Sequence, residues 1–231
     1  MRKTAIILAG GSGTRAGGGT PKQFRTLGGE PMFHRPVSAF MAADPQTEIV
    51  LAVNPLFLSE CREMVYAFPE ETAKKIRIVA GGSSRAESVS NALAAIPHNE
   101  GMVAVHDAAR PLVSVDMIKR GWEACGGKNC VVPAVPLTDS IRMLGGNGKS
   151  ESVDRSRFVA VQTPQVFPLD LLKRAYDTAD ALPGFTDDAS LAEAAGETIT
   201  LYEGEPENIK VTTPQDFGIA EIILRERASQ K

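Results

Sequence analysis

The chain has 231 residues, of which 43% are hydrophobic and 23% charged, enough for one large α/β domain or two small ones. This composition is ordinary for a globular protein and excludes a collagen-like or disordered chain. The 25 Lys and Arg against 28 Asp and Glu give a net charge of −3, so no overall basic field favours nucleic acid or an anionic membrane, and an anionic ligand must be held by local cations.

Apolar runs and cysteines indicate the compartment. The apolar run at residues 5–9 is far shorter than the roughly 20 residues that cross a bilayer, and Gly10-Gly11 ends it too soon for a signal peptide. Cys61, Cys125 and Cys130 are odd in number and form no C-x-x-C pair, which is typical of core residues in a reducing compartment. We expect a cytoplasmic protein with no membrane or nucleic-acid partner.

Short β-branched runs alternate with amphipathic stretches through the first half of the chain. Strands are predicted at residues 5–8, 49–53, 76–79 and 102–105, and helices at residues 33–42, 58–68 and 86–96. This alternation predicts a mainly parallel sheet, and because the strands are apolar on both faces, helices should cover both sides. Ligands of such folds bind at the carboxyl ends of the strands.

Residues 139–160 break this alternation. Segments 140–144 and 152–161 flank the turn-rich Gly145-Gly146-Asn147-Gly148, which predicts a two-stranded excursion, or arm, at about residues 139–160. The α/β pattern then resumes with helices at residues 169–181 and 188–195, a strand at 198–202 and a last helix from Pro214. No linker, repeat or low-complexity segment divides the chain, so residues 1–231 are expected to form one domain with this arm.

Segments rich in small and polar residues follow predicted strand ends at residues 10–22, 81–85, 106–110 and 136–142, and all could converge on one crevice. The first, which begins Gly10-Gly11-Ser12-Gly13, can bring backbone N–H groups to a phosphate, or can be a plain tight turn. A dinucleotide fingerprint is disfavoured because Gly17-Gly18-Gly19 prolongs the loop and Val53-Asn54 ends the second strand without an acidic residue. A Walker A loop and a nucleophile elbow each lack a required glycine. Arg15 and Lys22 can reach one polyphosphate from this loop, unless they are solvated surface charges.

Two further strand ends carry candidate site residues. Gly81-Gly82-Ser83-Ser84-Arg85 precedes a predicted helix containing Ser88, which suits contacts with a base or phosphate, although Ser83 or Ser84 can also cap the helix. His106-Asp107-Ala108-Ala109-Arg110-Pro111 places an acid and a base beside small residues, with an Asp107–Arg110 ion pair as the competing structural account. The 3 histidines show no metal-ligand spacing, and a lone His beside an Asp is more often structural.

Taken together, these residues resemble the 2-C-methyl-D-erythritol 4-phosphate cytidylyltransferase family over essentially the whole chain. The first block alone indicates only a sugar-nucleotide pyrophosphorylase-like fold, whereas the later blocks, in this order and spacing, make the narrower assignment specific. The blocks are Leu8-Ala9-Gly10-Gly11-Ser12-Gly13-Thr14-Arg15, Pro21-Lys22-Gln23, Gly81-Gly82 with Arg85, the run from His106 to Pro111, Thr163-Pro164-Gln165, Thr186-Asp187 and Asn208-Ile209-Lys210.

The resemblance implies a fold and an activity. The fold is an α/β, Rossmann-like nucleotidyltransferase three-layer sandwich with a mainly parallel sheet and a protruding β-arm, and the arm embraces a partner in a homodimer. The activity is the transfer of CMP from CTP to 2-C-methyl-D-erythritol 4-phosphate in non-mevalonate isoprenoid biosynthesis.

The resemblance also implies roles for individual residues. Catalytic roles fall to Arg15 and Lys22, which would neutralise the triphosphate and stabilise the transition state, and to Arg155 and Lys210, which would position the acceptor. The residues implied to bind the nucleotide are Ala9, Gly10, Gly11, Gly82, Ser83, Arg85, Ser88, Asp107 and Ala108. Those implied to bind the acceptor are Asp107, Arg110, Ser140, Arg155, Thr163, Thr186 and Lys210. Many relatives carry Asp in place of Ser83 and Thr in place of Ser140, but both serines can still form hydrogen bonds.

The chemistry needs charge neutralisation rather than a protein nucleophile. The acceptor phosphate is already an anion, so positioning and neutralisation should carry catalysis. Mg²⁺ or another divalent cation is therefore expected, with Asp107 as its candidate ligand, acting through water. A pentitol-phosphate cytidylyltransferase, such as the ribitol 5-phosphate enzyme, and a non-catalytic nucleotide-sensing module are the alternatives. Pyrophosphate release with CTP and each acceptor in turn separates them.

Overall fold

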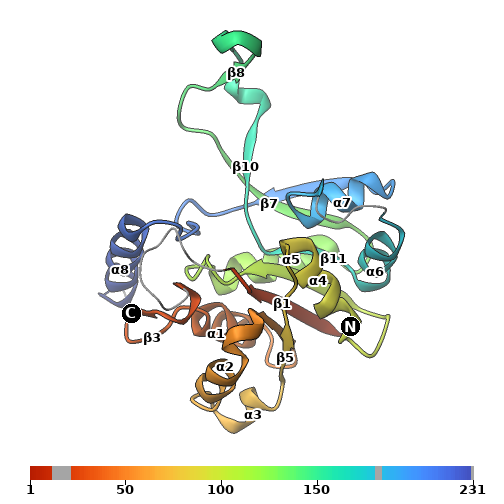
Figure 1. Cartoon of the computed structure of the whole chain (residues 1–231), viewed down its shortest axis with the longest axis vertical. Coiled ribbons are helices and arrows are strands. Elements are labelled where there is room, and N and C mark those ends of the chain that lie inside the picture. The colour runs from red at the N-terminus through yellow and green to blue at the C-terminus, as the bar shows by residue number, and fades with distance from the viewer. Residues whose placement is uncertain (12–21, 180–183, 230–231) are drawn as a thin grey trace.

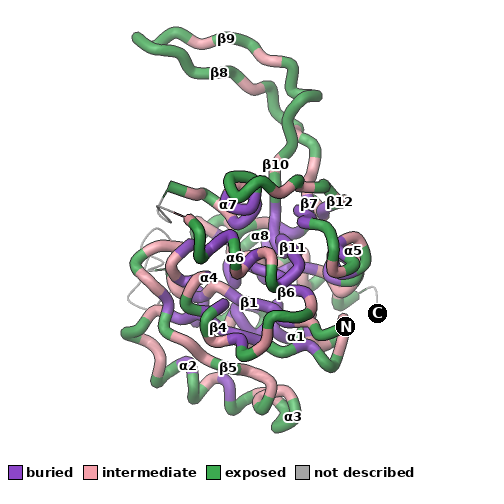
Figure 2. The backbone as a smooth tube through the Cα atoms, turned by 90° about the vertical axis from the view of Figure 1, so that its right-hand side faces the viewer, coloured by how far each residue is buried: buried purple, intermediate pink, exposed green. Residues whose placement is uncertain are grey.

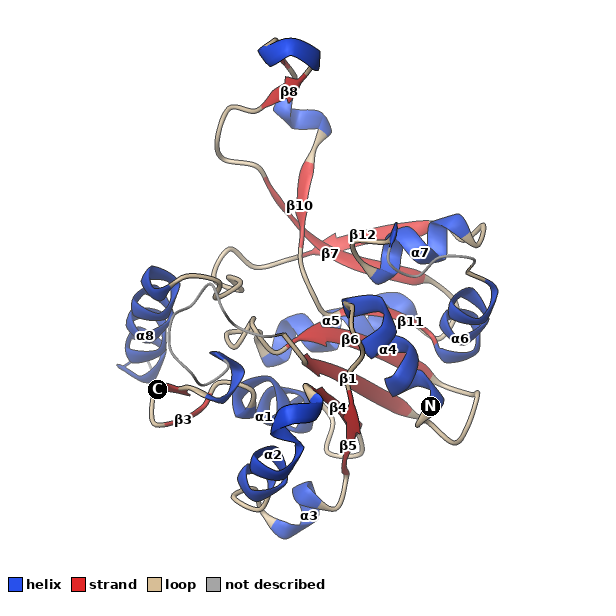
Figure 3. Ribbon diagram, in the orientation of Figure 1, coloured by secondary structure: helices blue, strands red, loops and turns tan. Residues whose placement is uncertain are grey.

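The computed structural model describes residues 1–11, 22–179 and 184–229 of the chain. An eight-stranded sheet forms the middle layer, with helices on both of its faces (Figures 1 and 3). Its strands are β1 (Lys3–Ala9), β4 (Glu48–Val53), β5 (Ile76–Ala80), β6 (Met102–Asp107), β7 (Cys130–Pro136), β10 (Val159–Val161), β11 (Gln165–Pro168) and β12 (Ile199–Glu203). The helices are α1 (His34–Ala43), α2 (Leu58–Val65), α3 (Glu70–Ala73), α4 (Arg85–Ala94), α5 (Val115–Cys125), α6 (Leu169–Thr178), α7 (Asp188–Ala194) and α8 (Pro214–Ser229).

Strand β1 lies inside the sheet and pairs in parallel with β4 on one side and β6 on the other. The pairs β4–β5 and β7–β12 are also parallel. Among the described strands of this sheet, only β10 and β11 run antiparallel, and β11 lies between β6 and β7. The structure therefore confirms the predicted mainly parallel sheet, and it adds β11 at a position where the sequence predicted no strand.

Side chains from successive residues of each strand enter opposite layers, as the strand period of two requires. Ile7 of β1 and Leu51 of β4 pack with α1, α2 and α5. Ile6 and Val50, their chain neighbours, pack with α4, α6 and α7 on the other face. Figure 2 shows these buried strands at the centre of the domain. This is the three-layer sandwich that the family resemblance implies.

The last helix covers a separate, smaller core. Ala220 of α8 packs with Leu27 and Met32, which lie in and just after the short strands β2 (Thr26–Leu27) and β3 (Glu30–Pro31). Arg227 donates from Nη1 to the carbonyl oxygen of Leu112 at 2.8 Å. The chain segment between β12 and α8, which contains Lys210, is thereby held against the carboxyl end of β6.

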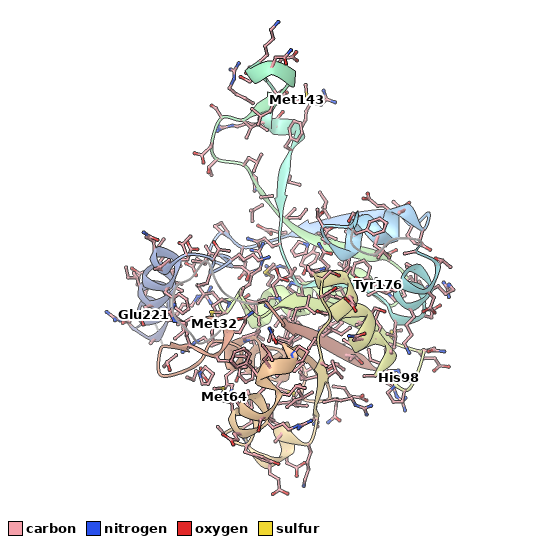
Figure 4. The ribbon with its side chains drawn as sticks, viewed as in Figure 1. Met32, Met64, His98, Met143, Tyr176 and Glu221 are labelled. Carbon is pink, nitrogen blue, oxygen red and sulfur yellow. The ribbon has the colours of Figure 1, made fainter. Side chains whose placement is uncertain are left out.

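The arm leaves the sheet after β7, projects away from the domain and returns as β10 (Figure 1). Its hairpin is confined to the far end, where β8 (Arg142–Leu144) pairs with β9 (Ser150–Ser152). The last three residues of the predicted strand at 152–161 belong to the main sheet instead, because β10 pairs with β7. Met143 lies near the tip (Figure 4), and Leu144 is 85% exposed. The arm thus carries apolar side chains that its own chain does not cover.

The three cysteines lie in the core of the domain. Cys61, Cys125 and Cys130 are buried and unpaired, as predicted. Burial raises the pKa of the Cys61 thiol to about 12, so it stays protonated as an apolar core group. Within the described ranges, no helix combines the length and apolarity needed to cross a membrane.

Candidate active site

A cavity of about 560 Å³ lies at the carboxyl ends of β1, β4 and β6, beside the start of α4. This is the edge at which parallel sheets bind ligands. Three of the four predicted polar segments meet here, and the fourth, residues 136–142, leads into the arm instead. The described lining residues are Leu8, Gly10, Gly11, Gln23, Asn54, Gly82, Ser83, Ser84, Arg85, Ser88, Asp107, Ala109 and Lys210.

A second cavity, of about 580 Å³, lies between α2, α3 and β5 and is lined by apolar groups such as Val65, Phe68 and Ile76. Its charged lining residues include Lys74, which is already paired with Glu70 at 2.8 Å. The two cavities are similar in size, but this one lies away from the strand ends that gather the predicted residues. We therefore assign the chemistry to the first cavity.

The carboxylate of Asp107, at the end of β6, is the electrostatic centre of this cavity. Asp107 is only 8% exposed. Lys210 Nζ lies 2.7 Å from Oδ2 of Asp107, and Arg85 Nε lies 3.4 Å from its Oδ1. Burial alone would raise the pKa of the Asp107 carboxyl, but the charges of Arg85 and Lys210 and the hydrogen bond from Lys210 outweigh it and hold the pKa well below its usual range. Asp107 is therefore an ionised acceptor at neutral pH and is too weak a base to take a proton.

Lys210 reaches Asp107 because the chain around it is hydrogen-bonded to the loop after β6 and to the segment before β11. Asn208 is fully buried and donates from Nδ2 to the carbonyl oxygen of Thr163 at 2.9 Å. Arg110 donates from Nη1 to the carbonyl oxygen of Asn208 at 2.8 Å. The backbone N–H of Val211 donates to the carbonyl oxygen of Ala109 at 2.7 Å. Lys210 therefore projects from a rigid segment.

The turn before α4 forms the opposite wall. Ser84 is the helix cap, since its Oγ accepts from the backbone N–H of Glu87 at 3.0 Å. The Ser88 hydroxyl accepts from the N–H of Gly82 at 3.0 Å and donates to the carbonyl oxygen of Ser84 at 2.8 Å. A Cβ on Gly82 would lie 2.3 Å from the Glu87 side chain, so only glycine fits. The first turn of α4 therefore forms part of the cavity wall, which Ser84, Arg85 and Ser88 line.

Ser83 sits at the mouth of this turn. Its N–H and its hydroxyl both donate to Oε2 of Glu87, at 2.7 and 2.5 Å. The hydrogen bonds from Ser83 lower the pKa of Glu87. Ser83 is therefore held by a local carboxylate, whereas Ser84 performs the capping that either serine could have provided.

The structure brings many of the predicted site residues to the cavity wall, namely Gly10, Gly11, Gly82, Ser83, Arg85, Ser88, Asp107 and Lys210. Ala9 and Ala108 are fully buried just behind that wall. Arg110 and Thr163 support it from behind, since the N–H of Asp107 donates to the Thr163 hydroxyl at 3.1 Å.

The remaining predicted residues lie elsewhere. Thr186 is exposed just before α7, and Ser140 and Arg155 lie on the arm, where Arg155 donates to the carbonyl oxygen of Thr138. Arg15 and the side chain of Lys22 fall outside the described residues. The described cavity of a single chain therefore does not include the predicted site residues of its own arm.

The competing interpretations of the His106–Arg110 block are resolved by the contacts. In the described structure Asp107 pairs with Arg85 and Lys210, and Arg110 bonds to carbonyl oxygens instead of forming the alternative Asp107–Arg110 pair. His106 is fully buried, with Nδ1 3.1 Å from the Thr163 hydroxyl and Nε2 3.1 Å from the Arg110 carbonyl oxygen. Its burial and these two contacts are typical of a histidine that supports the fold.

Sequence reasoning gave no role to several residues that the structure places here. Gln23 is 3% exposed and donates from Nε2 to the carbonyl oxygen of Gly11 at 3.0 Å, which fixes the start of the glycine segment. Asn54 follows β4, lines the cavity and caps the short helix Pro55–Phe57. Its position at a strand end was a usable signal, whereas the contact of Gln23 with Gly11 depends on the fold.

Comparisons with known proteins give one consistent family. The family model described as "IspD: 2-C-methyl-D-erythritol 4-phosphate cytidylyltransferase" matches residues 3–226. A protein of Symbiobacterium thermophilum named 2-C-methyl-D-erythritol 4-phosphate cytidylyltransferase is 45% identical over 230 residues, which cover 98% of this chain and 94% of that protein.

Solved structures of similar proteins share the fold. The crystal structure of 2-C-methyl-D-erythritol 4-phosphate cytidylyltransferase from Thermus thermophilus matches with a TM-score of 0.74 and 31% identity, over 95% of this chain and 98% of that chain. The 4-diphosphocytidyl-2C-methyl-D-erythritol synthase from Anaerococcus prevotii matches with a TM-score of 0.82 and 25% identity, over 97% of this chain and 98% of that chain.

The burial of His106 predicts a pH dependence of stability. Burial, the largest influence on this ring, lowers the pKa of His106 from 6.5 to about 4 in the fold, so the unfolded chain binds a proton there before the folded protein does. The free energy of unfolding contributed by a neutral His106 is fully present above about pH 7. It is lost, by about 3 kcal/mol in total, as the pH falls from the unfolded pKa of His106 through its folded pKa. Urea titrations across the interval should show a shallower loss of unfolding free energy in His106→Gln than in the wild type. Equal slopes would contradict the assignment.

Proposed function

This chain belongs to the 2-C-methyl-D-erythritol 4-phosphate cytidylyltransferase family, and we infer from that membership that it transfers CMP from CTP to 2-C-methyl-D-erythritol 4-phosphate and releases pyrophosphate. It is a nucleotidyltransferase of isoprenoid biosynthesis. The observation that carries this assignment is the family match over residues 3–226, which includes every described wall of the cavity.

The reaction is an in-line displacement at phosphorus. An oxygen of the acceptor phosphate forms a bond to the α-phosphorus of CTP, and the bond from that phosphorus to the bridging oxygen breaks, so pyrophosphate carries away the electron pair. The attacking oxygen is already anionic and gives up no proton. An ionised Asp107 is compatible with this chemistry because no general base is required.

The charges that the described cavity presents are balanced. Arg85 and Lys210 face Asp107, and Asp188 lies behind Arg85, 2.8 Å from its Nη2. A triphosphate therefore needs cations beyond these. In our proposal Arg15 and Lys22 supply them from the glycine segment and stabilise the charge that builds up in the transition state.

Mg²⁺ is expected to be held chiefly by the substrate phosphates, because in the described ranges no three metal-ligating side chains come together and both oxygens of Asp107 face a cation. Mg²⁺ keeps several waters and is commonly held by one or two carboxylates together with substrate phosphates. Asp107 would be that carboxylate, acting through water. The bound ion would offset the repulsion between the anionic substrates and stabilise the departing pyrophosphate.

The arm supports the proposal of a homodimer. Ser140 and Arg155 lie on it, outside the cavity lining of their own chain, while Met143, Leu144 and Phe158 expose apolar surface along it. A symmetric dimer buries such a surface and brings each arm to the partner's cavity. We propose that Ser140 and Arg155 act in the partner's site, with Thr186 assisting acceptor binding from its own chain. A cytoplasmic location is part of the proposal and is supported by the buried free cysteines.

Pyrophosphate release tests the activity. The full chain with CTP, Mg²⁺ and 2-C-methyl-D-erythritol 4-phosphate should release pyrophosphate in proportion to the cytidylylated product. Ribitol 5-phosphate and other nucleoside triphosphates should serve far less well. Release that is equally fast with ribitol 5-phosphate would favour the pentitol-phosphate activity, and no release with any acceptor would overturn the assignment.

Lys210 should affect the acceptor more than the nucleotide. In Lys210→Ala, loss of a charge-assisted hydrogen bond to the acceptor phosphate should raise KM for the acceptor about 10- to 100-fold and leave KM for CTP within about threefold. Because Lys210 also holds the Asp107 carboxylate, kcat should fall as well. Lys119→Ala, an exposed lysine of α5, is the matched control and should behave like the wild type. Unchanged acceptor kinetics in Lys210→Ala would move the acceptor site elsewhere.

The role of the arm across subunits predicts complementation between two variants that are impaired at low acceptor concentration. Lys210→Ala damages a cavity and Arg155→Ala damages an arm, so a mixed dimer retains one site built from an intact cavity and an intact arm. At an acceptor concentration far below the KM of each variant, mixing the two variants and allowing subunit exchange should restore up to about a quarter of the wild-type rate. Sedimentation should show a dimer throughout. A mixture no more active than its components would place Arg155 outside the partner's site.

A further inference from the structure

Arg85 forms an ion pair with a second carboxylate, that of Asp188, which does not line the cavity. Asp188 is 0% exposed, at the first position of α7, and its Oδ2 lies 2.8 Å from Arg85 Nη2. The other oxygen, Oδ1, accepts from the hydroxyl of Tyr176 on α6 at 2.6 Å. In Figure 4, Tyr176 lies within the domain body, in the region of α6. The chain of contacts therefore runs from α6 through α7 and α4 to Asp107 at the end of β6.

The backbone that carries Asp188 is fixed independently of Arg85. Gln165 of β11 accepts through Oε1 from the N–H groups of Asp188 and Ala189, at 3.1 and 3.0 Å. The same amide donates from Nε2 to Oδ2 of Asp187 at 2.8 Å, and Asp187 caps α7 by accepting from the N–H of Ser190 at 3.0 Å. Asp188 is thus a pre-set anchor, because its place is determined by the start of α7 and by β11.

The guanidinium of Arg85 is shared between two carboxylates. Its Nε donates to Asp107 and its Nη2 donates to Asp188. These two nitrogens form the edge of the guanidinium that can also bind a single carboxylate with both donors. Burial alone would lower the pKa of Arg85, but the charges of Asp188 and Asp107 outweigh it and raise the pKa above its usual value. While Asp188 occupies Nη2, this edge of the guanidinium offers Asp107 only Nε.

We propose that Asp188, held by Tyr176 and Gln165, is a positioning residue for cytidylyl transfer. It turns Arg85 so that the guanidinium restrains the Asp107 carboxylate from one side while Lys210 holds it from the other. The inference rests on the proposed function, because it assigns Asp107 to the reaction site. It also assigns a role to Asp188 in the Thr186-Asp187-Asp188 sequence, where the family resemblance implies a role only for Thr186.

The alternative is that the Arg85–Asp188 pair only stabilises the fold. Removing one member of a buried pair leaves an uncompensated charge and is strongly destabilising, whereas removing both members relieves most of that cost. A double variant therefore separates stability from positioning. If the pair is only structural, Arg85→Met/Asp188→Asn should regain both melting temperature and turnover.

The test uses the full chain and a double-mutant cycle of Arg85→Met and Asp188→Asn. We expect Asp188→Asn to lower kcat about 10- to 100-fold and to leave KM for CTP within about threefold, because displaced groups chiefly cost the reaction step. The double variant should regain the melting temperature lost in Arg85→Met but stay as slow as that variant. In the Arg85→Met background, Asp188→Asn should change kcat by less than about twofold, since its effect passes through Arg85.

The ion pair between Arg120 and Glu205, at 2.9 Å, gives the matched control, because both partners are partly exposed and neither lines the cavity. Arg120→Met/Glu205→Gln should keep wild-type kcat whatever its melting temperature. Recovery of kcat in Arg85→Met/Asp188→Asn, or multiplicative effects of its two substitutions, would overturn the proposal.

A crystal structure of Asp188→Asn gives a readout that does not depend on turnover. Both donors of the Arg85 edge should then lie on Asp107, and the carboxylate should be displaced from its wild-type position. An unmoved Asp107 and Arg85 would overturn the positioning role. Failure of the proposed function would appear separately, as a wild-type protein that releases no pyrophosphate.

Discussion

One buried carboxylate determines how this site is built. Asp107 lies at the end of a strand that is covered on both faces, where an isolated negative charge would be costly. Lys210 and Arg85, from segments far apart in the chain, compensate that charge at 2.7 and 3.4 Å. The caps, buried amides and hydrogen bonds around the cavity serve largely to place these cations. A strand end, a helix start and the segment before α8 are thereby locked into one wall.

Much of the site could be predicted from local sequence signals. The β-branched runs gave the parallel strands, and glycine or serine segments directly after them marked the edge where ligands bind. Gly82, Ser83 and Ser88 reach the cavity for this reason, since they follow β5 and begin α4. Asp107 was found by the same rule. The family resemblance added Lys210, whose own neighbourhood carries no such signal.

What could not be predicted depends on contacts between distant segments. The pairing of Arg85 with Asp188 spans 103 residues, and sequence alone suggested the nearer partner, Arg110, for Asp107. Strand β11 is antiparallel and short, so it lacks the alternating pattern of the crossover units. Helix α5 was not predicted, although Ser114, Gly126 and the spacing of Met117, Gly121 and Cys125 would have supported it. The hairpin predicted for the arm is too long, because Val159–Val161 is a strand of the main sheet.

The central claim is that the nucleotide binds at the carboxyl ends of β1, β4 and β6, beside Asp107 and the start of α4. A crystal structure of the full chain with CTP tests this most directly. The account predicts the base and ribose against Gly10, Gly82 and Ser88, with the triphosphate directed toward the glycine segment. A nucleotide bound instead in the apolar cavity between α2, α3 and β5, or on the arm alone, would contradict it.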